Sequence, residues 1–197
     1  MATAVALSVA LISLAGLALG CEMRFPASAD VTRSGGPTAA SKGVSQRLPT
    51  GVPTTQLAIF LPRLLEDNSL RLARTARTIP SEEAARWTLQ ALIDGPDGDE
   101  RAGDYQYPLS PRTRILDLTV TDGTVSVEFD SEIDRVRGRP FSELAYWSIV
   151  FTLTEVPGVR AVALVRAGEP VTEFGFPPVP IRRVATRAEA PAWVVPI

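Results

Sequence analysis

The chain opens with a mostly apolar run, Met1 to Gly20, that ends at the only cysteine, Cys21. A run rich in Ala, Leu and Val that small residues close before a cysteine is typical of a bacterial lipoprotein signal. We therefore expect residues 1–20 to be a signal peptide outside the fold. We expect Cys21 to carry the lipid that anchors the chain to the extracytoplasmic face of the membrane, because several acyl chains on one residue hold a protein there almost permanently.

The leader departs from the usual lipoprotein pattern. Ala18 and Leu19 are not the residues that normally stand at these positions, and no Lys or Arg holds the start of the leader in the cytoplasm. Two other interpretations stay open. The run is long enough to be an uncleaved membrane helix, and it is also compatible with a plain secretory leader followed by an incidental cysteine.

The composition excludes several classes of enzyme. There is no histidine, and Lys42 is the only lysine. Ser-His-Asp and Cys-His systems need an imidazole, a Ser-Lys dyad needs a positioned lysine, and zinc sites depend on His and Cys. Arginine stays protonated and cannot act as a base, so carboxylates, hydroxyls and backbone groups are the remaining candidates. We expect a protein that is not an enzyme and holds no cofactor or metal.

The charge and the cysteine count restrict the partners and the means of stabilisation. The formal net charge of −2 shows no basic surplus of the kind that a nucleic-acid-binding protein needs. A single cysteine, used for lipidation, leaves none for a structural disulfide. The fold must therefore be held by its hydrophobic core.

Residues 21–55 predict a flexible tether, because small and polar residues dominate and large apolar residues are too few to bury a core. The composition becomes more apolar from Gln56 onward. The apolar run 57–61, closed by Pro62, predicts a buried strand, and the partly alternating segment 70–78 predicts a second one.

A helix is predicted after these strands. Ser81 is a suitable N-cap, Glu82 and Glu83 would lie in the first turn, and Gly95-Pro96 would end the helix. Its apolar residues recur at helical spacing and form one stripe that needs a sheet to cover it. These residues are Ala85, Leu89, Leu92 and Ile93.

The segments 113–121 and 124–130 predict a β-hairpin, because Asp122-Gly123 between them is typical of a tight turn. Each segment alternates apolar and polar residues, so each strand should have one face in the core. The core residues expected here are Leu116, Leu118, Val120, Val125, Val127 and Phe129.

A second helix is predicted over 142–155, with Ser142 as its cap and Pro157-Gly158 as its end. The β-branched residues around 149–152 would also suit a strand, but the spacing of apolar residues favours a helix. A last strand over 159–166 completes a single α+β domain at 56–176. We expect the order β-β-α-β-β-α-β, with two helices packed on a mixed or antiparallel sheet, and a Pro-rich tail over 177–197.

These motifs occur in the order seen in the sporulation and spore-germination GerMN domain family, and the chain resembles that family over Gln56–Phe176. The resemblance rests on the helix ending Leu-Ile-Asp-Gly-Pro at 92–96, the hairpin, and Ser-Ile-Val-Phe-Thr-Leu-Thr-Glu-Val-Pro-Gly-Val at 148–159. Ser148 departs from the family's frequent Gln, and the domain is present once where the founding member has two.

The resemblance implies a non-catalytic α/β domain related to ring-building modules of secretion channels and displayed on envelope lipoproteins. It brings no catalytic residue and leaves the binding partner open. It also implies no role in sporulation, because the domain occurs in bacteria that make no spores.

Two groups of carboxylates are candidate metal sites. Residues at two-residue spacing could place several carboxylates on one strand face and suit calcium, but an extended row cannot wrap an ion. An acidic loop lacks the order of an EF-hand. We expect both groups to be solvated surface. The row is Glu128, Asp130, Glu132 and Asp134, and the loop contains Asp94, Asp97, Asp99, Glu100 and Asp104.

Tyr146, Trp147 and Val150 lie partly off the main apolar stripe of the second helix, so an exposed partner interface is one interpretation. The other is a helix buried on two sides. The Pro-rich segment 177–180 is either a polyproline ligand or a spacer, and we expect a spacer.

Taken together, these patterns favour a lipid-anchored extracytoplasmic protein whose domain associates with itself or with another envelope protein. One alternative is a hydrolase of wall glycan that uses a carboxylate pair such as Asp130 and Glu155. A further alternative is a small-ligand-binding lipoprotein, although one domain of this size lacks the usual two-lobed cleft.

Overall fold

The computed structural model describes residues 51–197. The predicted signal peptide, Cys21 and most of the predicted tether lie outside the described residues. Within the described part, no helix combines the length and apolar character that crossing a bilayer requires.

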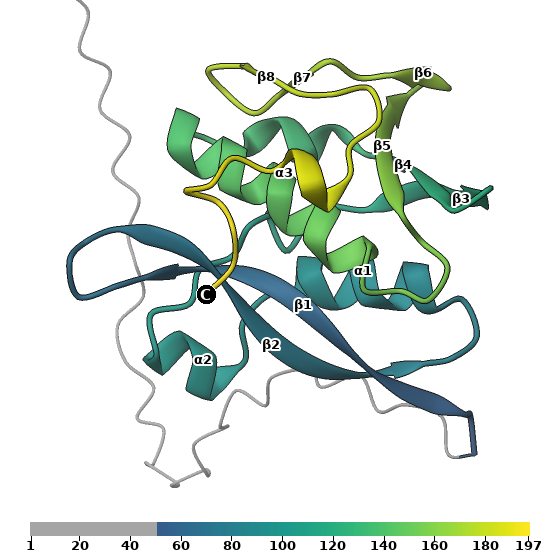
Figure 1. The fold of residues 1–197 in the computed structure, drawn as a ribbon, viewed down its shortest axis with the longest axis horizontal. Coiled ribbons are helices and arrows are strands. Elements are labelled where there is room, and N and C mark those ends of the chain that lie inside the picture. The colour runs from purple at the N-terminus through teal and green to yellow at the C-terminus, as the bar shows by residue number, and fades with distance from the viewer. Residues whose placement is uncertain (1–50) are drawn as a thin grey trace, which may run out of the picture. The chain divides into compact units, whose positions relative to one another are not determined.

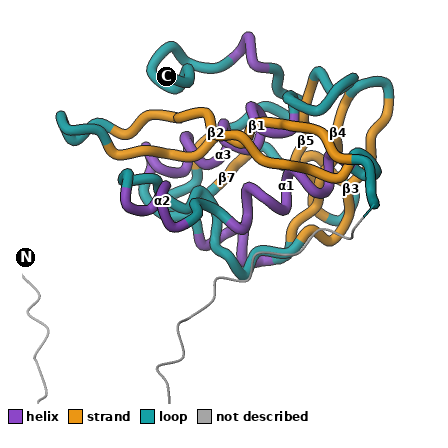
Figure 2. The backbone as a smooth tube through the Cα atoms, turned by 90° about the horizontal axis from the view of Figure 1, so that it is seen from below, coloured by secondary structure: helices purple, strands orange, loops and turns teal. Residues whose placement is uncertain are grey.

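A long antiparallel hairpin begins the domain. β1 (Thr54–Leu64) pairs with β2 (Leu70–Pro80) along its whole length, which confirms both predicted strands. β1 is buried on both faces over residues 57–62. On its other edge, the N–H of Phe60 donates to Thr152 Oγ1 of the second long helix at 3.0 Å. Figures 1 and 2 show the hairpin crossing the molecule with its turn projecting beyond the helices.

α1 (Ala84–Asp94) follows, as predicted, but its cap differs. Its N-cap is Glu83, in the left-handed conformation, and no acidic residue lies in its first turn. Ser81 does not cap the helix, because its N–H donates to the carbonyl of Pro53 at 2.8 Å and extends the hairpin. The predicted stripe is confirmed, since all four of its residues are buried: Ala85, Leu89, Leu92 and Ile93. A short helix, α2 (Gly98–Ala102), comes next.

A four-stranded mixed sheet forms the other side of the domain. Its strands are β3 (Ile115–Thr121), β4 (Thr124–Phe129), β5 (Ala161–Arg166) and β6 (Glu169–Pro170), in the order β3-β4-β5-β6. β4 and β5 are parallel, and the other neighbours are antiparallel. The predicted α+β order is confirmed, with the difference that the first two strands form a sheet of their own.

The predicted turn joins β3 to β4. Asp122 and Gly123 both have positive φ, 50° and 78°, which is the two-residue turn that suits the twist of a hairpin. A Cβ atom on residue 123 would lie 2.9 Å from the carbonyl oxygen of Gly158. Glycine is therefore required here both by the backbone conformation and by the close approach of another loop.

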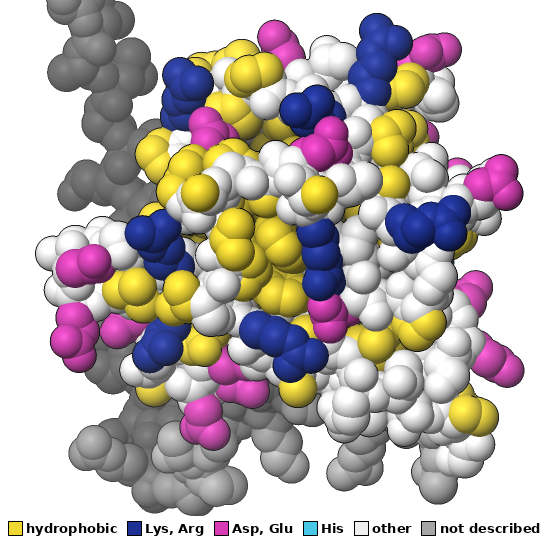
Figure 3. Space-filling model, viewed as in Figure 1, with side chains coloured by type: hydrophobic (Ala, Val, Ile, Leu, Met, Phe, Trp, Pro, Cys, Tyr) yellow, Lys and Arg dark blue, Asp and Glu magenta, His cyan; other side chains and the backbone are white. Residues whose placement is uncertain are grey.

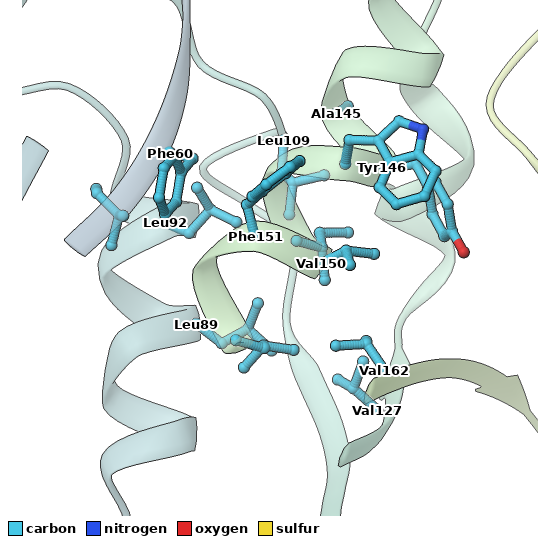
Figure 4. Packing of buried hydrophobic residues seen from close by; sticks show 14 of the residues in the cluster. Phe60, Leu89, Leu92, Leu109, Val127, Ala145, Tyr146, Val150, Phe151 and Val162 are labelled. Atoms are coloured by element: carbon cyan, nitrogen blue, oxygen red, sulfur yellow. The ribbon is translucent and has the colours of Figure 1, made fainter. Parts of the chain in front are cut away.

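α3 (Arg139–Leu153) connects β4 to β5 after a 3₁₀ turn, η1 (Ser131–Arg135). It begins one turn earlier than predicted, after Gly138, with Pro140 in its first turn, where a missing N–H costs nothing. Ser142 is therefore inside the helix and does not cap it. Figure 4 shows residues of β1, α1, β4 and β5 converging on Val150 and Phe151 of α3.

Of the two interpretations left open for the second helix, the structure shows the helix buried on two sides and not an exposed patch. Tyr146 and Trp147 are 4% and 6% exposed, and Val150 is fully buried. The reason is that α3 is covered from two sides: by β1 and α1 on one side, and by the residues after β5 on the other.

Residues 177–197 correct a second expectation, because they pack on the domain and do not leave it as a tail. β7 (Glu173–Phe174) pairs with β8 (Val179–Pro180), and Ala185 bridges to Val162 of β5. The segment then makes a short 3₁₀ turn, η2 (Arg187–Glu189), and its last N–H donates to the carbonyl of Leu72 in β2 at 2.9 Å.

Candidate functional site

β3 has a core face that the described structure covers only in part. Leu118 pairs with Val127 and Val120 pairs with Val125, so both residues face the same side as these two valines. Val125 and Val127 are completely buried, whereas Val120 is 52% exposed and Leu118 is partly exposed. The predicted alternation of β3 is therefore present. The predicted burial is wrong for Val120, whereas Leu118 is half-buried and packs against the core.

The core face of β3 is left partly open because α1 packs elsewhere. The buried face of α1 lies against the hairpin and α3, and α1 does not extend over the outer strand of the mixed sheet. Leu116 is exposed for another reason. The register with β4 shifts between Ile115 and Asp117, so Leu116 is the extra residue of a β-bulge and is 59% exposed.

The uncovered face opens into a groove between α1 and β3. One part is an apolar pocket of about 620 Å³, and the other is a charged pocket of about 740 Å³. The two share Arg86 of α1, and we call them together the α1–β3 groove. The apolar part is lined chiefly by Ala84, Ala85, Leu118, Val120, Val156 and Val159. The charged part is lined chiefly by Arg86, Trp87, Arg112, Arg114, Asp130 and Glu132.

The outer backbone edge of β3 is also free within the described residues, since only β4 pairs with it. The opposite edge of the same sheet differs. There β6 has only two residues, and Ala185 occupies the edge of β5 at Val162. β3 thus offers unpaired N–H and C=O groups along its outer edge, with an apolar face beside them.

The four carboxylates that could suit calcium are spread over β4 and η1, and each has a separate partner. Glu128 accepts the N–H of Ala167 at 2.7 Å, and Asp130 accepts the N–H of Glu132 at the start of η1. Glu132 pairs with Arg135 at 3.0 Å, and Asp134 pairs with Arg166 at 2.6 Å. No three metal-ligating side chains gather in the described residues.

The acidic loop after α1 contains a structural ion pair. Glu100 of α2 receives a two-pronged contact from Arg77 of β2, at 2.8 and 2.5 Å, and also accepts from Thr75 and from the N–H of Asp97. Burial alone would raise the pKa of Glu100. These hydrogen bonds and the Arg77 charge outweigh it and lower the pKa from 4.5 to about 2. The group attaches α2 to the hairpin.

The carboxylates proposed for glycan hydrolysis lie in different surroundings. Asp130 caps η1 and lines the charged part of the α1–β3 groove. Glu155 follows α3 and pairs with Arg187 at 2.5 Å and with Arg74 at 3.5 Å. Arg187 also donates to the carbonyl of Phe151 and to Thr154 Oγ1, both at 2.6 Å. Glu155 therefore helps to hold the C-terminal segment on α3.

Tyr146 and Trp147 do line a smaller pocket, of about 370 Å³, between α3 and the C-terminal segment. The Tyr146 hydroxyl donates to the carbonyl of Arg182 at 3.4 Å, and burial raises the pKa of Tyr146 to about 12. Figure 3 shows hydrophobic side chains at the centre of this face with basic side chains around them. The two rings are mainly packing for the chain's own last residues.

Comparison with known proteins places these features in a family context. The family model described as Germane, sporulation and spore germination, matches residues 63–172. No curated protein matches the sequence.

Three solved structures are similar. The first GerMN domain of the sporulation protein GerM from Bacillus subtilis aligns with a TM-score of 0.54 and 18% identity, over 69% of this chain and 100% of that one. The tandem GerMN domains of the same protein align with a TM-score of 0.50 and 21% identity, over 71% of this chain and 50% of that one. A Clostridium perfringens protein provisionally called a lipoprotein aligns with a TM-score of 0.49 and 15% identity, over 72% of this chain and 93% of that one. The GerMN resemblance is confirmed, and the chain spans half of the tandem protein.

Proposed function

Because the chain belongs to the Germane family of sporulation and spore germination proteins, we propose that it is a lipid-anchored envelope protein that works by protein association. In this proposal Cys21 holds the chain at the extracytoplasmic face of the membrane. The domain then receives an extended strand of polypeptide in the α1–β3 groove. It carries out no catalysis.

The anchor is supported by the sequence, in which the only cysteine directly follows an apolar leader. Replacing Cys21 by Ser removes the thiol that would take the lipid. We expect the Cys21→Ser chain to leave the membrane fraction or to accumulate as an unprocessed precursor. If fractionation and the N-terminus stay unchanged and the leader remains attached, an uncleaved helix is the anchor.

The single observation that carries the association proposal is the combination of a free strand edge with an open apolar face. An added strand would hydrogen-bond to the outer edge of β3. Its apolar side chains would enter the pocket of about 620 Å³ beside Leu118 and Val120. Exposed apolar surface next to an unpaired edge costs solubility, so its presence on a small domain favours a partner that covers it.

A site-specific cross-linker tests the groove directly. We expect a photoreactive residue at position 120, in the full chain and in its own cells, to cross-link to protein. The same residue at position 66, in the exposed turn of the β1–β2 hairpin, is the control and should give no product. Equal labelling at both positions, or none at position 120, would remove the groove from the proposal. Glycan hydrolysis by the purified chain that a carboxylate-to-amide change abolishes would overturn the non-catalytic function itself.

A further inference from the structure

We propose that the strand received by β3 is β3 of a second copy of this chain. The two strands would pair antiparallel about a twofold axis and join the two mixed sheets into one. This proposal rests on the proposed function above and names its partner. The interface would be isologous, with the same surface contributed by both copies, which is the commonest way in which identical chains associate.

Hydrogen bonding restricts how two β3 strands can align. Thr121 pairs with Thr124 across the two-residue turn. The pair that closes such a turn exchanges backbone hydrogen bonds, so Thr121 directs its backbone groups toward β4. These directions alternate along an antiparallel ladder. Leu118 and Val120 therefore direct their N–H and C=O groups outward, where they are available to another strand. A second copy satisfies them when the twofold axis passes through Leu118 or through Thr119.

The side chains distinguish these two alignments. With the axis at Leu118, Val120 lies opposite Leu116 of the second copy, and each copy's Arg114 lies at the level of the other's Asp122. With the axis at Thr119, Asp122 lies opposite the apolar Leu116, and Arg114 meets no acidic residue. Opposite charges across a strand pair are favourable, and a charge against an apolar side chain is not. Charge complementarity therefore selects the axis at Leu118.

This self-complementarity is the reason for choosing a second copy over another protein. When a second β3 lies antiparallel to the first, apolar residues lie opposite apolar residues, and a basic residue lies opposite an acidic one at each end. The pairing would also cover the exposed side chains of Leu116 and Val120, at 59% and 52%. Because Leu118 and Val120 face the groove, the apolar pockets of both copies would lie on the same side of the joined sheet.

A charge introduced at Thr119 should strengthen or weaken self-association depending on how the two strands align. It is exposed and points away from the groove, so its replacement does not alter the core. With the axis at Leu118, Thr119 of each copy lies opposite Asp117 of the other, so the twofold axis produces this pair two times. We expect Thr119→Lys to tighten self-association of the full chain about fivefold and Thr119→Glu to weaken it by a similar factor. Sedimentation velocity in excess detergent, over a range of chain concentrations, measures both.

A cysteine at the axis gives a second measurement. Residues opposite each other in a hydrogen-bonded antiparallel pair have Cα atoms about 5.5 Å apart, which is within the range of a disulfide. The Leu118→Cys chain should therefore oxidise to a covalent dimer. Thr121→Cys, three positions from the axis, should form no disulfide-linked dimer, and neither should the unaltered chain, whose one cysteine is Cys21.

The outcomes separate this proposal from the one it rests on. A chain that stays monomeric at every concentration, or a Thr119→Lys chain that associates more weakly, overturns pairing of two copies about Leu118. If position 120 then cross-links to a different envelope protein, strand addition at the groove stands with another partner. If position 120 also gives no product, both proposals fail.

Discussion

Glu100 should make the stability of the domain depend on acid in a defined pH window. Its carboxylate lies between Arg77, Thr75 and the N–H of Asp97, and it is 12% exposed. The pKa of Glu100 falls from an ordinary value of 4.5 to about 2 in the folded chain. A depressed carboxyl pKa means that the unfolded chain binds the proton more readily, so protonation favours unfolding.

The size of the effect follows from the same two values. A difference between 4.5 and about 2 corresponds to about 3 kcal/mol of stability at neutral pH. This contribution is complete above the ordinary value, falls to about half near pH 3, and is almost lost at pH 2. Glu100→Gln removes the titration. We therefore expect it to destabilise the domain by about 3 kcal/mol at pH 7 and by about half as much at pH 3.

Urea unfolding followed by tryptophan fluorescence measures this at pH 7, 5, 4 and 3. Glu82→Gln is the matched control, because that side chain is exposed and precedes α1. It should shift the midpoint little at any pH. If the difference between the unaltered and Glu100→Gln chains is the same at pH 7 and pH 3, the charge of Glu100 does not contribute to folding in the way its contacts indicate.

Two further predictions concern the core and the C-terminal segment. Leu92→Ala should lower the free energy of unfolding by about 2–5 kcal/mol, because Leu92 is fully buried between α1 and the hairpin, and a loss below about 1 kcal/mol would show that the helix register is wrong. Arg187→Ala should speed amide exchange and proteolysis in residues 177–197 more than in the hairpin, because Arg187 joins that segment to Phe151, Thr154 and Glu155. Arg187→Lys keeps the charge but loses the forked contact, so its exchange and proteolysis rates in residues 177–197 should lie between those of the unaltered chain and Arg187→Ala. Equal protection of this segment in the unaltered chain and both variants would contradict the role of Arg187.

The order of elements could be predicted from the sequence because its signals are local. Gly95-Pro96 ends α1, and Asp122-Gly123 turns the hairpin, each through the backbone conformations that those residues favour. Helix starts were predicted less well. Ser81 and Ser142 both have the chemistry of an N-cap, but Ser81 is used by the hairpin and Ser142 is enclosed by a helix that begins at Arg139. A serine that is able to cap a helix therefore does not show where the helix begins.

The candidate site could not be predicted, because exposure depends on what covers a face and not on the face itself. Leu118 and Val120 alternate as well as Val125 and Val127, and the register puts all four on one side of the sheet. Only the position of α1, set by its packing on the hairpin, decides that the cover stops between β4 and β3. That information lies in contacts between distant segments.

The same reasoning explains why the sequence leaves the exposure of α3 open. Tyr146 and Trp147 lie off the stripe that faces β1, so periodicity alone leaves them exposed. Residues 177–197 contain few strong signals for a helix or strand, yet they return over α3, where Arg182 and Arg187 attach them. The last residues of the chain thus cover the apolar surface of α3 that contains Tyr146 and Trp147. It leaves open the edge strand, where only another polypeptide can complete the sheet, and this asymmetry is why association is sought at β3 and not at α3.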